Sequence, residues 1–169
     1  MSEAKNLVVL GRFQPFHKGH EQLVFAAYDF AKTGGLNLVL AIGSAQCGYE
    51  PKNPWTIEER EEMIQRWVDE SNIDASIVTI EDIGDAPRWV EHAEKAHGKG
   101  ILFSSDEPTL TLYEQAGWNV QRAEYAQRDT FEGWRVRQTM RMLSTVDDHD
   151  AIQMVLNEVL PTTIAAWII

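Results

Sequence analysis

The stretch Leu7-Val8-Val9-Leu10, followed directly by Gly11-Arg12-Phe13-Gln14-Pro15-Phe16-His17-Lys18-Gly19-His20, decides the fold of this chain. A short, continuous apolar run is typical of a strand that is buried on both faces of a parallel sheet. We expect a helix from about Gly19 to Lys32, because its apolar residues recur at helical spacing and Gly34-Gly35 can end it. The stretch therefore predicts a strand, a tight loop and a helix, which is the first half of a crossover unit.

The same alternation of strands and helices continues along the chain. Further strands are expected at Leu36–Ile42, Ser76–Ile80, Ile101–Phe103 and Trp118–Ala123. Helices begin at the capping box Thr56-Ile57-Glu58-Glu59 and at Pro87, and another runs through Tyr113 to Ala116 before Gly117. From about Gly133 the pattern is helical only, with a second helix near Asp147–Leu160.

This order of elements predicts a Rossmann-like α/β fold. We expect a three-layer sandwich with a parallel five-stranded sheet and a helical C-terminal extension. The length of 169 residues favours a single domain, with an α/β core over residues 1–130 and a helical part over residues 131–169. Ligands bind such sheets at the carboxyl ends of the strands, where the strand order reverses, so the loop after the first strand is the first place to look for a site.

Composition excludes several classes of partner. Fifteen Lys and Arg against 26 Asp and Glu give a net charge of −11, and such a surface repels nucleic-acid phosphates. We find no run of the roughly 20 apolar residues that a membrane-spanning helix needs, and Met1 to Asn6 carry no apolar signal region. The single Cys47 can form neither an internal disulfide nor a zinc cluster. We therefore expect a cytoplasmic protein that binds neither nucleic acid nor membrane.

The loop from Gly11 to His20 combines residues that suit a polyphosphate. Gly11 permits a sharp turn and a close approach of ligand to backbone, and Arg12 offers a fork of donors. His17 and His20 are three residues apart and share a helix face, while Gly19 leaves room for a flat base. The new helix also points its N-terminal amides toward the same place, which favours an anion.

Two other interpretations of the histidine pair are weaker. The histidines could merely cap the helix, but the combination with glycine, proline and the position after the first strand argues for a site. A zinc site would need further ligands, and the sequence offers no cysteine or carboxylate at ligand spacing. We therefore expect no protein-bound metal.

The segment His17-Lys18-Gly19-His20 resembles the HxGH signature of the nucleotidylyltransferase superfamily. The longer stretch Gly11 to His20 is more similar to the archaeal-type nicotinamide mononucleotide (NMN) adenylyltransferases. Further similarities occur in the family's order along the chain, from about Val8 to Met140. They are Ile42-Gly43-Ser44-Ala45-Gln46, Asn53-Pro54-Trp55-Thr56 with Glu59-Arg60, Glu81-Asp82-Ile83 and Trp89-Val90.

The resemblance implies adenylyl transfer from ATP to NMN, which gives NAD and pyrophosphate. It implies direct in-line attack, with Mg²⁺ held by the substrate phosphates. The implied catalytic residues are His17, His20, Arg12 and Arg137. The implied ATP-binding residues are Gly11, Arg12, Phe13, His17, Gly19, His20 and Arg137.

On the acceptor side the resemblance places Trp89 against the pyridinium ring and Asp82 at the carboxamide. A cationic ring is attracted to an indole face, so a tryptophan suits NMN. Ser44 and Gln46 follow the second strand and could line the path of the acceptor phosphate. Without the resemblance, Trp89 would be interpreted as a core residue of an amphipathic helix, and Ser44 and Gln46 as ordinary polar loop residues.

One segment departs from the family pattern. In Phe131-Glu132-Gly133-Trp134-Arg135-Val136-Arg137, Glu132 and Trp134 stand where serine and threonine are expected. An acid beside a triphosphate is unfavourable unless a metal or Arg135 offsets it.

This departure leaves two alternatives open: a transferase that moves AMP or CMP onto another phosphorylated acceptor, and a nucleotide-binding sensor without turnover. The resemblance also implies a homo-oligomer, and the apolar tail Ile164–Ile169 could pack on the protein's own sheet or on a neighbour.

Overall fold

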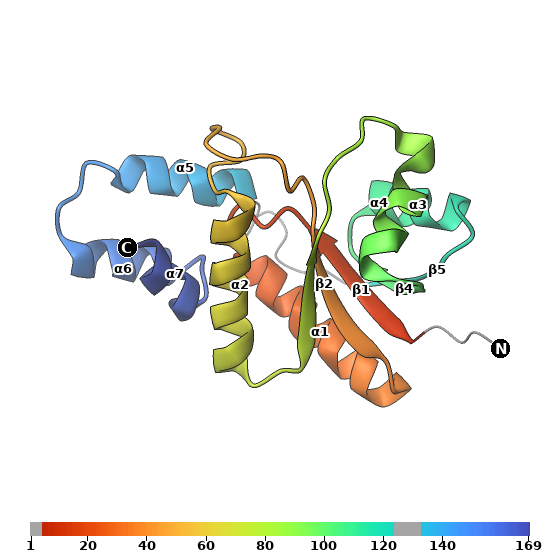
Figure 1. The fold of residues 1–169 in the computed structure, drawn as a ribbon. Coiled ribbons are helices and arrows are strands. Elements are labelled where there is room, and N and C mark those ends of the chain that lie inside the picture. Colours follow the sequence, from red (N-terminus) through yellow and green to blue (C-terminus); the bar gives the residue numbers. More distant parts are fainter. Residues whose placement is uncertain (1–4, 124–132) are drawn as a thin grey trace.

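In the computed structural model, which describes residues 5–123 and 133–169, the predicted sheet is present. Its strands are β1 (Asn6–Gly11), β2 (Asn37–Ile42), β3 (Ala75–Thr79), β4 (Gly100–Ser104) and β5 (Asn119–Arg122). All pairs are parallel, and the order across the sheet is β3-β2-β1-β4-β5. The Rossmann-like prediction is therefore confirmed (Figure 1).

The sheet opens at the carboxyl end of β1, between β1 and β4. On one side β1 pairs with β2 as far as Gly11 and Ile42, whereas on the other it pairs with β4 only as far as Val8 and Leu102. The chain runs from β1 to β2 on one side and returns to β4 on the other, so this is the switch point. The loop with both histidines leaves the sheet here.

Helices cover both faces of the sheet. Helices α1 (Lys18–Gly34) and α2 (Ile57–Ser71) bury Val24, Ala27, Met63 and Trp67 in one core cluster with Leu7 and Val9 of β1. Helices α3 (Ala86–His97) and α4 (Glu107–Gln115) form the second cluster around Val8, with Val90, Ala93, Leu110 and Tyr113. Alternate residues of β1 thus enter opposite cores, as a strand buried on both faces requires.

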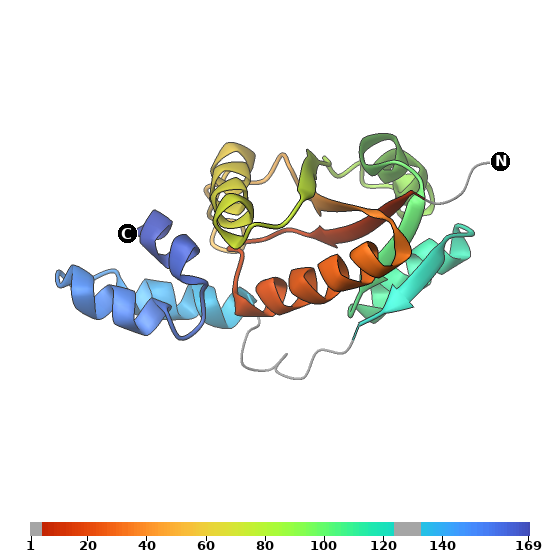
Figure 2. The same cartoon turned by 90° about the horizontal axis from the view of Figure 1, so that it is seen from below.

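The C-terminal region forms three helices, α5 (Gly133–Leu143), α6 (His149–Leu156) and α7 (Thr162–Ile168). They lie together beyond α2, to one side of the sheet (Figure 2). The predicted helix near Asp147–Leu160 is too long, because α6 ends at Leu156. The apolar tail lies within the region expected to be helical and forms a separate helix, α7, after Pro161. Proline starts this last turn well because its fixed φ and missing amide suit a helix N-terminus.

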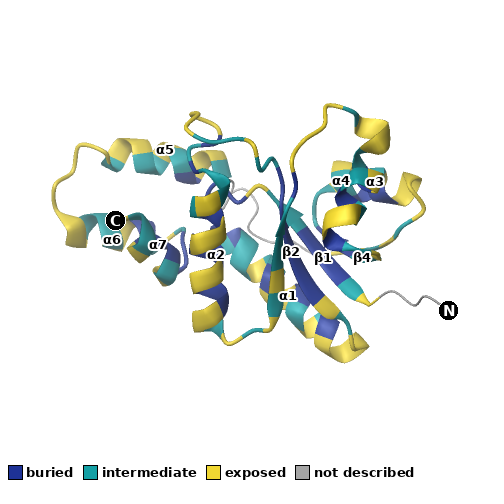
Figure 3. Ribbon diagram, in the orientation of Figure 1, coloured by how far each residue is buried: buried dark blue, intermediate teal, exposed yellow. Residues whose placement is uncertain are grey.

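Helix α7 packs on α2 rather than on the sheet. Leu156, Leu160, Ile164 and Ala165 are buried in the same cluster as Trp67 of α2. Burial is deepest in β1, β2 and β4, whereas α5 and α6 expose much of their surface (Figure 3). Among the described residues, no helix has the length and apolar character needed to cross a membrane.

Candidate active site

His17 and His20 stack on each other at the start of α1. Their ring centroids lie 3.7 Å apart with an interplanar angle of 24°. His17 is the N-cap residue: its Nδ1 accepts a hydrogen bond from the Gly19 amide, and His20 Nδ1 accepts one from the His17 amide. Because each Nδ1 is an acceptor, the proton of each neutral ring lies on Nε2. The pair therefore caps the helix and carries the site donors at the same time.

Both imidazoles are neutral in the folded protein. Burial, and then the Arg137 guanidinium, lower the pKa of His17 to about 3. Burial and the neighbouring His17 hold the pKa of His20 well below its ordinary value, although a hydrogen bond to the Pro15 backbone opposes this. The rings of Phe13 and Phe16 pack against His20, with centroid distances of 4.8 and 5.7 Å. At neutral pH the pair therefore presents N–H donors rather than two positive charges.

The backbone amides at the N-terminus of α1 are less available to bind an anion than the sequence analysis expected. The Gly19 amide is taken by His17 Nδ1, and the Lys18 amide donates to the Val159 carbonyl at 2.9 Å. Both amides are hydrogen-bonded within the protein. The binding of an anion at this place therefore relies more on side chains than we predicted.

Gly11 and Phe13 form a close contact beneath this loop. A Cβ on Gly11 would lie 2.8 Å from the Phe13 ring, so any larger residue would displace that ring. Phe13 itself has a φ of 54°, in the left-handed region, and is almost fully buried. Glycine at position 11 is thus required by packing, as well as by any ligand.

Arg60 joins the two loops that follow β1 and β2. Its buried guanidinium donates to the carbonyls of Arg12, Gly43, Ser44 and Cys47 at 2.9–3.2 Å, and to that of Thr56 in its own helix. Burial lowers the pKa of this group. The sequence analysis had noted Arg60 only as part of a resemblance and gave it no role. The structure makes it the residue that holds both loops in place.

Arg137 of α5 reaches the loop that carries Arg12, although the two residues are far apart in the chain. Arg12 Nη1 donates to Asn53 Oδ1 at 3.2 Å, and Arg137 Nη1 donates to the Gln14 carbonyl at 2.9 Å. Burial, followed by the charges of Arg12 and Arg141, lowers the pKa of Arg137. The structure therefore brings together His17, His20 and two of the predicted cations.

The predicted acceptor residues form a second group at the end of β2. The Asp82 carboxylate accepts from Ser44 Oγ at 2.7 Å and from Gln46 Nε2 at 3.2 Å, and the Asp82 amide donates to Gln46 Oε1. Ser44 and Gln46 thus position the Asp82 carboxylate, a role that the sequence analysis did not assign to them.

Trp89 lies in the first turn of α3, half-buried against the second core cluster. Its ring lies edge-on to Tyr113, with centroids 6.3 Å apart. Leu10, near the carboxyl end of β1, packs against the same cluster. Trp89 is therefore partly a core residue, as its pattern on the helix suggested, and partly exposed.

Comparison with known proteins identifies the family. Residues 8–135 match the model of the cytidylyltransferase-like family. The chain belongs to this family. It is 33% identical over 132 residues to the nicotinamide-nucleotide adenylyltransferase of Methanolobus tindarius, with 78% of this chain and 74% of that protein covered. It is 34% identical to the enzyme of that name from Haloarcula marismortui, with 78% and 68% covered.

Two solved structures of adenylyltransferases share the fold of this chain. One is the Plasmodium falciparum nicotinic acid mononucleotide adenylyltransferase complexed with NaAD, with a TM-score of 0.62, 11% identity, and 98% of this chain and 95% of that chain covered. Another is a bifunctional NMN adenylyltransferase/ADP ribose pyrophosphatase from Francisella tularensis, complexed with AMP and a manganese ion. It has a TM-score of 0.63 and 22% identity, with 81% of this chain but only 41% of that one covered.

Of the two residues that depart from the resembled motif, Trp134 lies in the described part of the chain. Glu132 lies outside the described residues. Trp134 is 49% exposed, and the Arg135 guanidinium stacks over its ring at 4.5 Å. A Cβ at Gly133 would lie 2.9 Å from Arg137 Nη1, so a larger residue there would shift the end of this flexible side chain.

Two further parts of the site escaped the sequence analysis. Gln14 exchanges a pair of hydrogen bonds with the backbone of Trp55, at 2.9 and 3.0 Å. The β4–α4 loop carries Ser104 and Asp106, whose side chains accept bonds from backbone amides at the switch point. The position of this loop, after the strand that adjoins β1, is the signal that could have found it.

No group of three or more His, Cys, Asp or Glu side chains suited to a metal occurs in the described part of the chain.

Proposed function

We propose that this protein transfers the adenylyl group of ATP to NMN, giving NAD and pyrophosphate. The observation that carries the proposal is the stacked His17–His20 pair at the switch point, with the Arg137 charge acting on it. The family and the names of the relatives support the same reaction.

The reaction needs no general base. The NMN phosphate is already ionised at neutral pH, so its oxygen can attack the α-phosphorus of ATP directly. A new P–O bond forms as the bond to the β-phosphate oxygen breaks, and pyrophosphate leaves with the electron pair. The barrier falls through positioning and charge neutralisation, which is the general pattern of phosphoryl-type transfer.

The neutral histidines suit the transferring phosphate. His17 holds its proton on Nε2 and can donate it to a phosphate oxygen as charge develops there. The Nε2 proton of His20 is directed at the Pro15 carbonyl, so His20 donates to phosphate by exchanging that bond. Arg12 and Arg137 supply the positive charge that the developing pyrophosphate requires. Gly11, Phe13 and Gly19 would provide the floor for the adenine, where Gly19 is buried and adds no side chain of its own.

The acceptor side suits a cationic ring with an amide substituent. The Asp82 carboxylate is held by Ser44 and Gln46 and can accept from the carboxamide. The exposed part of Trp89 can stack on the pyridinium.

Mg²⁺ fits this site as a substrate-bound ion. The described residues offer arginines rather than a cluster of carboxylates, so the ion would be held by phosphate oxygens. When bound, it would neutralise charge on the β- and γ-phosphates.

We further infer one domain over residues 1–169 and, from the single Cys47, a cytoplasmic location. Self-association into a homo-oligomer is also expected.

The test is a pyrophosphate-release screen with ATP and Mg²⁺ against a panel of phosphorylated acceptors. We expect release with NMN, together with formation of NAD. Release with a different acceptor alone would reassign the substrate. ATP binding without release against the whole panel would favour a sensor.

A tryptophan substitution tests the acceptor assignment. Trp89→Ala should weaken NMN affinity by roughly 1–2 kcal/mol, the scale of a partly desolvated cation–π contact, and spare ATP affinity. Calorimetry with each ligand measures both. Equal losses for the two ligands would indicate a damaged core instead, because Trp89 also packs on Tyr113.

A further inference from the structure

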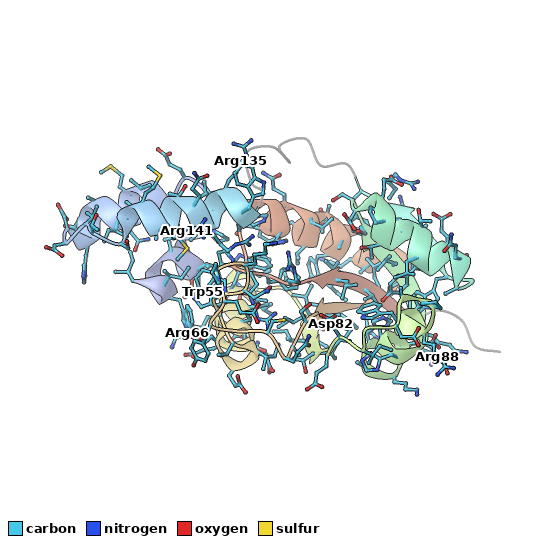
Figure 4. All side chains as sticks on the ribbon, turned by 90° about the horizontal axis from the view of Figure 1, so that it is seen from above. Trp55, Arg66, Asp82, Arg88, Arg135 and Arg141 are labelled. Atoms are coloured by element: carbon cyan, nitrogen blue, oxygen red, sulfur yellow. The ribbon has the colours of Figure 1, made fainter. Side chains whose placement is uncertain are left out.

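A cavity of about 270 Å³ lies beside the candidate site, between α5 and the loop that precedes α2. Pro51, Pro54 and Trp55 line it from the loop, and Arg137, Met140 and Arg141 from the helix. Arg137 and Arg141 are four residues apart, so they lie on one face of α5. Figure 4 shows Arg141 on the side of α5 that faces Trp55, with Arg135 on the opposite side.

Gln14 connects this cavity to the histidine loop. Its side chain bonds the backbone of Trp55 on one wall, and its carbonyl accepts from Arg137 on the other. Gln14, three residues before His17, thus bonds residues on both walls of the cavity.

The positive charges around the cavity are not neutralised by the protein. Within residues 5–123 and 133–169, no carboxylate forms an ion pair with Arg12, Arg137 or Arg141. The lowered pKa of Arg137 has the charges of Arg12 and Arg141 among its causes. In a protein with a net charge of −11, this local excess of cations favours an anionic ligand.

We propose that Arg141 is a further substrate-binding residue, which together with Arg137 holds the terminal phosphate of the triphosphate donor. The inference rests on the proposed function and deepens it: the α-phosphate lies at the histidines, and the β- and γ-phosphates extend toward α5. The apolar walls formed by Pro51, Pro54 and Trp55 exclude water on one side, which strengthens the attraction between guanidinium and phosphate. Arg141 thus makes the site selective for a long polyphosphate, and it holds pyrophosphate after transfer.

The experiment compares two probes by calorimetry, inorganic tripolyphosphate and AMP. Arg141→Gln should weaken tripolyphosphate binding about tenfold, the scale of one charge-assisted contact, and leave AMP affinity unchanged. Arg141→Lys should recover part of the loss, because it keeps the charge. In steady-state assays, Arg141→Gln should raise KM for pyrophosphate in the reverse reaction without raising KM for NAD.

Arg66→Gln is the matched control. Arg66 is an exposed arginine on α2 with an i,i+4 partner, Glu62, and its loss removes the same charge without touching the cavity. Equal effects of the Arg141 and Arg66 variants, or equal losses for both probes, would overturn the proposal. If tripolyphosphate binding depends on Arg141 while no NAD forms, the subsite stands and the proposed acceptor is wrong.

Discussion

His17 has a structural role besides the catalytic role proposed for it. His17 caps α1 through Nδ1, and this bond sets the tautomer that leaves a donor on Nε2. Burial keeps the His17 ring neutral in the folded protein. At a pH where the ring is protonated only in the unfolded chain, this difference lowers the free energy of unfolding.

This cost predicts a specific pH dependence. Above the ordinary histidine pKa of 6.5 neither state binds the proton, so the full stability is present. As the pH falls from 6.5 toward the folded value of about 3, only the unfolded chain protonates at this position, and stability is lost.

Between about pH 7.5 and pH 5.5, wild type should lose about 1 kcal/mol more free energy of unfolding than His17→Gln. Urea denaturation at the two pH values measures this difference. Parallel losses in both proteins would show that His17 protonates normally in the fold.

At the scale of elements, the loops after β1 and β2 depend on α2. Each loop turns through a non-glycine residue at positive φ, Phe13 at 54° and Ser44 at 49°. Such residues persist only where the surroundings hold them, and Arg60 binds the carbonyls of Arg12 and Ser44. One helix residue therefore holds the backbone of both Arg12 and Ser44.

Arg60→Lys should lower the free energy of unfolding by roughly 2–4 kcal/mol, because an ammonium cannot reach the same set of buried carbonyls. It should also raise KM for ATP and for NMN, since both loops lose their support. Arg66→Lys, on the exposed face of the same helix, should change stability by less than about 0.5 kcal/mol. A fully stable Arg60→Lys protein would remove Arg60 from this role.

At the scale of the whole molecule, the C-terminal helices complete the core under the site. Ile164 of α7 is fully buried in the cluster that contains Phe16 and Trp67. The Val159 carbonyl, between α6 and α7, accepts from the Lys18 amide at the start of α1. The tail thus supports the helix that carries the histidines.

Ile164→Ala should destabilise the protein by roughly 2–4 kcal/mol, the cost of a buried cavity. Ile169→Ala, at a residue that is 41% exposed, should have an effect below about 0.5 kcal/mol. Thermal and urea unfolding of both variants test this. If the two variants unfold alike, α7 is a peripheral addition rather than part of the core.

The sequence by itself determined the strands and helices of residues 5–123, because apolar periodicity, capping boxes and glycine stops are local signals. It also placed the histidine loop at the switch point, since the order of elements implies the order of parallel strands. The motif was sufficient to expect the catalytic pair and both arginines.

Only the tertiary structure decided how these residues meet. The bond between Arg137 and Gln14 joins positions 123 apart, and the pair between Gln14 and Trp55 spans 41. Such contacts leave no periodic trace in the chain, and neither does the burial that makes both histidines neutral. The role of Arg60, the packing of α7 on α2 and the cavity beside Arg141 were missed for the same reason. Each depends on surfaces brought together by packing, which local spacing does not encode.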